Sequence, residues 1–130
     1  MLLNRPGLAA LLLVASAPVV AGDFDGSKSL ICAPSEAQDC APDEGCSATH
    51  PHEIGAPAFV RIDFKKKALI GPQKSTPIEL MEKTDTQLYL TGIERGFSWT
   101  IALAQKDGAM SATLISDSGT YVLFGYCTPQ

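Results

Sequence analysis

The feature that most constrains the fold is a row of short segments, between Pro57 and the C-terminus, in which apolar and polar residues alternate. Alternation with a period of two places one set of side chains on each face of an extended strand. It is clearest in AFVRIDF, at 58–64, and in GFSWTIALA, at 96–104. Their apolar faces consist of Val60, Ile62 and Phe64 in the first and of Phe97, Trp99, Ile101 and Leu103 in the second. The pattern predicts β-strands throughout this part of the chain.

Seven strands are predicted in all, separated by short turns. They span 58–64, 67–71, 76–82, 86–93, 96–104, 109–116 and 120–127. Short connections make successive strands neighbours in space, so we expect an antiparallel meander over 57–130. A meander must hide its apolar face in a barrel or a sandwich, and a barrel also removes exposed edges. We therefore predict an all-β fold in which the meander closes into a small β-barrel.

Residues 1–21 have the organisation of a signal peptide. Arg5 precedes an apolar run from Leu8 to Val20, and small side chains at Val19 and Ala21 suit cleavage after Ala21. The run is shorter than the roughly 20 residues that a membrane-spanning helix needs. No cysteine stands directly after the predicted cut, as a lipid anchor would require. We expect a periplasmic or secreted protein without an integral membrane segment.

Export decides how the four cysteines are interpreted, because an oxidising compartment favours disulfides. Cys32, Cys40, Cys46 and Cys127 allow three pairings, which the sequence alone does not distinguish. We favour Cys40–Cys46 as a local link and Cys32–Cys127 as a staple, since the last strand would otherwise fray. The segment 22–56, rich in Pro, Gly, Ser and Asp, is expected to be irregular and to lie over one end or side of the barrel.

The charge balance excludes several classes of partner. The formal net charge is −4, and loss of residues 1–21 leaves nine basic and fourteen acidic residues, or −5. Nucleic acids and anionic membranes require clustered Lys and Arg. The one basic run, Lys65-Lys66-Lys67, is interpreted as a solvated hairpin turn. No nucleic-acid partner is therefore expected.

The segment that holds the histidines could instead form a metal site. Haem attachment and thioredoxin chemistry require Cys-x-x-Cys spacings that are absent. The segment from Cys46 through His50 and His52 approaches the spacing of zinc ligands, and Glu53 or Asp43 would add an oxygen. The other interpretation leaves both histidines solvated in a loop kept extended by Pro51. A zinc or copper site at His50 and His52 is thus predicted as an alternative, and no cofactor is expected.

Catalysis finds little support in the sequence. Nucleophilic mechanisms pair a Ser or Cys with a base, and both histidines lie in one Pro-broken loop while the thiols are expected to be oxidised. Binding remains, either of a small apolar ligand in the barrel mouth or of a protein partner. In the last strand Tyr121 faces opposite to Phe124 and Tyr126, so both faces are apolar. These three aromatic residues are the predicted ligand or partner contacts.

The stretches FDGSKSLICAPSEAQDC, RIDFKKKALIG and FGYCTP resemble a group of small exported bacterial proteins with the signature FDGSK-LICA-EA-DC, for which no function is established. The resemblance covers most of the mature chain and implies the same compartment and fold. The size and disulfide-linked ends are also similar to those of small secreted β-barrel inhibitors of lysozyme, whose inhibitory loop motif is not matched. A non-catalytic exported binding protein is therefore expected, with metal binding or inhibition of a cell-wall hydrolase as alternatives.

Overall fold

The chain forms antiparallel strands from Leu30 to its C-terminus in a computed structural model that describes residues 13–17 and 22–130. The predicted cleavage site after Ala21 lies outside the described residues. In the described ranges, no helix is long and apolar enough to cross a membrane. The elements are β1 (Leu30–Ala41), β2 (Gly45–Thr49), the 3-10 turn η1 (Pro51–Ile54), β3 (Val60–Asp63), β4 (Ala68–Ile70), β5 (Ser75–Pro77), β6 (Leu80–Lys83), β7 (Gln87–Glu94), β8 (Phe97–Ala104), β9 (Ala109–Ser116) and β10 (Gly119–Pro129).

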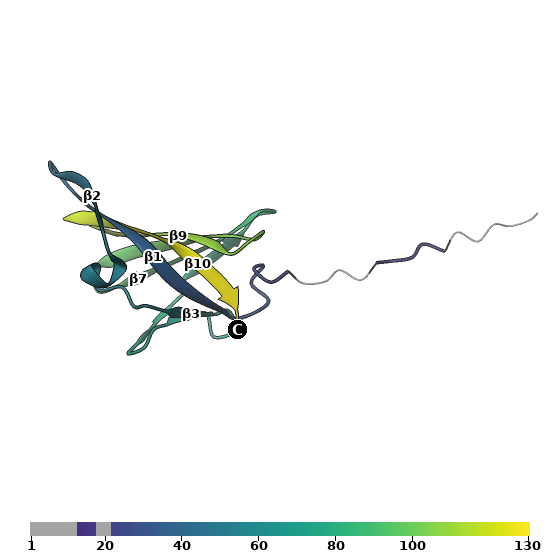
Figure 1. The fold of residues 1–130 in the computed structure, drawn as a ribbon. Helices are drawn as coiled ribbons and strands as arrows, with labels where there is room; N and C mark the ends of the chain where they lie inside the picture. The colour runs from purple at the N-terminus through teal and green to yellow at the C-terminus, as the bar shows by residue number, and fades with distance from the viewer. Residues whose placement is uncertain (1–12, 18–21) are drawn as a thin grey trace, which may run out of the picture.

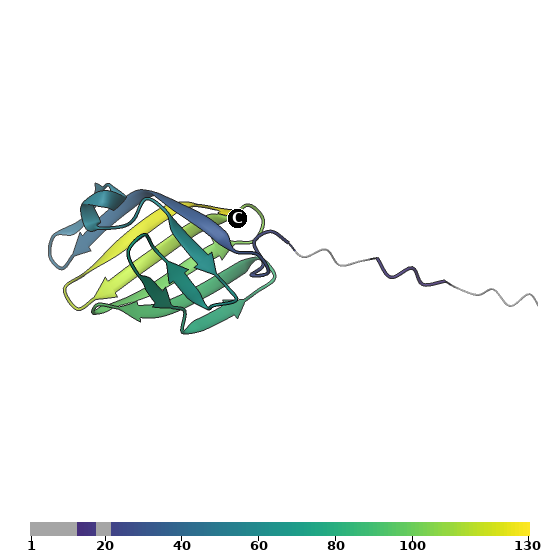
Figure 2. The same cartoon turned by 90° about the horizontal axis from the view of Figure 1, so that it is seen from below.

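The strands form one curled sheet in the order β5-β4-β3-β1-β10-β9-β8-β7-β6, with β2 paired to β1 (Figure 1). In Figure 2 the short strands β3 to β5, in teal, lie in front of the longer green and yellow strands. The prediction of an all-β antiparallel fold is confirmed, and the curled sheet is a half-barrel.

The two edges of the half-barrel are joined by one bent segment. β5 and β6 are separated only by Ile78 and Glu79. The Ile78 amide donates to the Lys67 carbonyl beside β4, at 2.8 Å, and the Glu79 amide donates to the Thr91 carbonyl of β7, also at 2.8 Å. The single predicted strand 76–82 is therefore two strands meeting at a corner, with Ile78 buried inside it. This corner brings the two sides of the sheet around a common interior.

The prediction that segment 22–56 is irregular needs correction, because β1 is a strand of 12 residues that pairs with β10 along most of its length. Its inward residues include Leu30, Cys32 and Ala37, but the register shifts between Pro34 and Glu36. This bulge interrupts the alternation with a period of two. The residues between Cys32 and Ala37, at 33–36, are small or charged. The alternation that revealed the later strands is consequently absent from the β1 sequence.

Both disulfides have the pairing that the sequence favoured, Cys32–Cys127 and Cys40–Cys46. Each joins residues directly opposite one another, the first across β1 and β10 and the second across β1 and β2. The predicted turn at Lys65-Lys66-Lys67 also lies where expected, between β3 and β4, with all three lysines exposed.

The interior is filled at one end of the half-barrel, which we call the closed end. Leu30, Leu88 and Leu103 are fully buried there. Phe24 covers this end from the N-terminal turn and packs against Gly108, which leaves no room for a side chain. Of the segment 22–56 that was predicted to cover the barrel, Phe24 in the part before β1 packs against this end. The buried cluster as a whole consists of Leu30, Cys32, Ala37, Ile62, Leu69, Ile78, Leu88, Leu90, Trp99, Ile101, Leu103, Met110, Ala112, Leu123 and Cys127.

Candidate functional site

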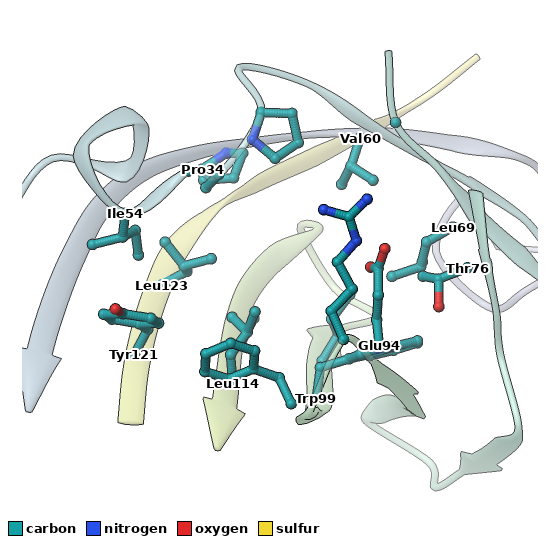
Figure 3. Close-up of a pocket in the computed structure, with 18 of the residues that line it drawn as sticks. Pro34, Ile54, Val60, Leu69, Thr76, Glu94, Trp99, Leu114, Tyr121 and Leu123 are labelled. Atoms are coloured by element: carbon teal, nitrogen blue, oxygen red, sulfur yellow. The ribbon is translucent and has the colours of Figure 1, made fainter. Parts of the chain in front are cut away.

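The other end of the half-barrel is hollow. A cavity of about 560 Å³ lies between the two sides of the curled sheet and opens to solvent. In Figure 3, Val60 and Leu69 lie across the open space from Leu114 and Tyr121. The volume falls within the range of cavities that hold small ligands, roughly 300 to 1,000 Å³.

The cavity walls come from the inward faces of strands whose alternation is visible in the sequence. Trp99 and Ile101 of β8 alternate with outward polar or small residues, and the same alternation places Ala112 and Leu114 of β9 and Leu123 of β10 inward. Cross-strand pairing sets them side by side, since Ile101 lies opposite Ala112. The wall is therefore a continuous apolar surface on rigid strands.

Trp99 is held in this wall by ring packing. Its side chain is 5% exposed and lies against Gly92, its cross-strand neighbour on β7. The indole Nε1 is buried and has no hydrogen-bond partner in the described part of the chain. The position of the ring is thus determined by the shape of its surroundings.

The opposite wall and the edge of the mouth are formed by shorter elements. Val60 and Leu69 face inward from β3 and β4. Ile54 is the last residue of η1, and Gly55 follows it in the left-handed conformation (φ 81°). Only glycine adopts that conformation without strain, so Gly55 suits the return of the chain toward β3.

Among the described residues that line the cavity, the charged ones lie at the mouth. They are Lys74, Glu94 and Arg95. Lys74 Nζ lies 2.6 Å from Glu94 Oε1, so these two charges neutralise each other. Arg95 has no ion-pair partner within residues 13–17 and 22–130. The mouth therefore carries one uncompensated positive charge above an apolar interior.

Arg95 is presented by a tight hairpin. Glu94 and Phe97 pair across β7 and β8, so Arg95 and Gly96 are the two residues of the turn, with φ of 49° and 80°. Two residues with positive φ characterise the type I′ turn that matches the twist of a hairpin. Asn, Asp or Gly usually occupies the position that Arg95 takes here, because other side chains are strained in this conformation.

The predicted aromatic contacts separate onto two surfaces. Tyr121 lines the cavity and lies beside Phe97, with ring centroids 5.9 Å apart. Phe124 and Tyr126 are on the outer face, 41% and 65% exposed. The sequence assigned the two faces of β10 correctly. Tyr121 belongs to the cavity, and the other two do not.

The predicted metal ligands lie away from the cavity. His50 and His52 flank Pro51, with their rings stacked at a centroid distance of 5.7 Å. Glu53 accepts a hydrogen bond from Thr49 Oγ1, at 2.7 Å, and this bond is the main cause that lowers its pKa. Within the described ranges, no group of three or more His, Cys, Asp or Glu side chains is placed to hold an ion. Zinc or copper binding by the pair stays a prediction.

Sequence reasoning missed the residues at the cavity mouth. Ile54, Lys74 and Arg95 lie on three connections that carry no motif, and they meet only because the sheet curls. The one local signal was an Arg-Gly turn between two strands, where Asn-Gly or Asp-Gly is the usual pair.

Comparison with known proteins finds no matching family model, no matching curated protein and no matching solved structure.

Proposed function

We propose that the protein is an exported, non-catalytic binding protein that holds a small apolar molecule in the hollow end of its half-barrel. The cavity of about 560 Å³, with apolar walls and a solvent-open mouth, carries this proposal. An apolar molecule that enters the cavity removes its own surface and the apolar walls from water, which favours binding. The signal-peptide pattern and the two disulfides support an oxidising compartment outside the cytoplasm.

The chemistry of the lining favours binding over hydrolysis. Among the described residues around the cavity, the one carboxylate is that of Glu94, and Lys74 already pairs with it. The remaining polar groups are suited to orienting a ligand at the rim. Apolar walls with a few polar groups at one edge are typical of ligand-holding sites.

The test is a titration with N-phenyl-1-naphthylamine, an uncharged dye that fluoresces in apolar surroundings. We expect the wild-type protein to bind it saturably at one site. Ala112→Phe places a ring in the cavity wall and should weaken binding about fivefold or more, because overpacking a cavity that holds a ligand costs at least about 1 kcal/mol.

The matched control is Ser111→Phe, which adds the same ring to the neighbouring residue on the exposed outer face of β9. This variant should bind the dye as the wild type does. Thermal melts establish that both variants are folded. Equal binding by folded Ala112→Phe and wild type, or no saturable binding by the wild type, would overturn the proposal.

A further inference from the structure

We infer that the cavity takes a single-chain amphiphile with an anionic head group, and that Arg95 recognises the head. The inference rests on the proposed function, because it names the ligand class for the same cavity. It follows from the separation of chemistry along the cavity, with apolar walls inside and charge at the mouth.

The interior suits an apolar tail. Trp99, Ile101 and Met110 are buried on one side, and Val60 and Leu69 lie on the other. None of these walls offers a charged group to a ligand placed deep in the cavity. Each methylene added to a tail should tighten binding by about fourfold until the space is full.

The mouth suits an anion. Lys74 and Glu94 neutralise each other at 2.6 Å, which leaves the guanidinium of Arg95 as the net charge at the rim. A guanidinium presents a planar pair of N–H donors that matches a carboxylate or sulfate. A cationic head group would meet Arg95 with the same sign of charge, and an uncharged one would forgo the charge-assisted bonds.

The backbone conformation at Arg95 decides which substitution tests the role of its side chain. Its φ of 49° favours Asn or Gly, so the arginine occupies this position at a conformational disadvantage. Because Asn tolerates this φ, the variant Arg95→Asn removes the positive charge and preserves the turn.

The experiment measures binding of dodecanoate, dodecanol and dodecyltrimethylammonium, each below its micelle concentration. Trp99 is the only tryptophan of the chain and lines the cavity, so its fluorescence reports occupancy. The wild type should bind dodecanoate most tightly and the cation most weakly. Arg95→Asn should weaken dodecanoate binding about tenfold, as loss of a hydrogen bond to a charged group does, and leave dodecanol binding unchanged.

The matched control is Lys67→Asn. Lys67 is another cation in a hairpin turn with positive φ, 52°, but it does not line the cavity. It should keep the preference for dodecanoate, and Arg95→Lys should keep part of it. Undiminished dodecanoate binding by Arg95→Asn would overturn the assignment of the head group.

The outcomes separate the two proposals. If dodecanol binds and Ala112→Phe abolishes that binding, the cavity is a ligand site whatever Arg95 does. If all three amphiphiles bind equally, the anionic head group is refuted while the cavity remains. If none changes the fluorescence of Trp99 or the thermal midpoint, both proposals fail.

Discussion

At the scale of single residues, Gly92 fixes the wall of the cavity. A Cβ added at Gly92 would lie 2.6 Å from Trp99 Cε2 and 2.8 Å from the Pro77 carbonyl oxygen. Only glycine lets the indole and the end of β5 approach β7 this closely. Because Trp99 Nε1 has no hydrogen-bond partner in the described part of the chain, the ring has no other anchor than packing.

Gly92→Ala should therefore lower the free energy of unfolding by about 2 kcal/mol, the usual range for overpacking. The same change should displace the indole and alter the emission of Trp99 in the folded state. Urea denaturation followed by tryptophan fluorescence measures both effects. Gly22→Ala is the control, since its Cβ would meet nothing closer than 3.8 Å. A Gly92→Ala variant with wild-type stability and emission would contradict this account of the wall.

At the scale of elements, the N-terminal turn depends on one carboxylate. Asp25 accepts backbone hydrogen bonds from Gly22 and Ser27, each at 2.9 Å, and the turn they form carries Phe24 to the closed end. Hydrogen bonds from the Ser27 side chain and backbone are the main causes that lower the pKa of Asp25. The turn is thus held by the ionised form of Asp25.

A carboxyl whose pKa is lowered on folding stabilises the fold above its unfolded pKa and loses that effect as the pH falls through its folded value. For Asp25 this interval lies below about pH 4. Asp25→Asn should therefore be less stable than the wild type at pH 7 and should lose less stability between pH 5 and 2. Urea midpoints across this range provide the measurement. Asp117→Asn, in the β9–β10 turn, removes the same charge elsewhere, and a parallel response of both variants would argue against a specific role for Asp25.

The elements also show what the sequence could predict. Most strands from β3 to β10 were predicted because apolar and polar residues alternate in them and because several of the turns carry the usual Asp and Gly residues. β1 escaped notice because its bulge between Pro34 and Glu36 shifts the alternation. The corner at Ile78 escaped as well, since a buried residue continues the alternating pattern and only hydrogen bonding to two different strands reveals the bend.

At the scale of the whole molecule, the two disulfides differ in what they constrain. Cys32–Cys127 links residues separated by 95 positions, and Cys40–Cys46 links residues separated by 6. In the chain-entropy model the first restricts the unfolded chain by about 4 to 5 kcal/mol and the second by about 2 kcal/mol. The long link holds the first and last strands of the fold together.

Replacing Cys32 and Cys127 together by alanine should therefore lower the free energy of unfolding by about 4 kcal/mol, and replacing Cys40 and Cys46 together by about half as much. Alanine avoids burying a hydroxyl at Cys32, which is fully buried. Guanidinium denaturation of the two double variants compares the effects. A larger loss on removing the short link would show that the hairpin, and not the linked ends, limits stability.

The cavity also belongs to this scale, which is why only its general existence could be predicted from the sequence. The inward faces of β8 to β10 were predictable, and so was the possibility of a ligand at the barrel mouth. Whether the interior is filled depends on the distance between the two sides of the sheet. That distance cannot be predicted from any local sequence pattern. Arg95 becomes significant only once Lys74 is seen to neutralise Glu94 from another loop.

The pairing of the first and last strands has one more consequence. The Gln130 amide donates to the Ser29 carbonyl at 3.0 Å, and Leu30 lies opposite Pro129. A short peptide would span Gln130 and Ser29, so the chain from Ser29 to Gln130 can be made circular if the N-terminal turn that carries Phe24 is left out. It can then be reopened at the exposed Lys65-Lys66 turn, which gives a circular permutant with β1 and β10 as a covalent hairpin and both cavity walls intact.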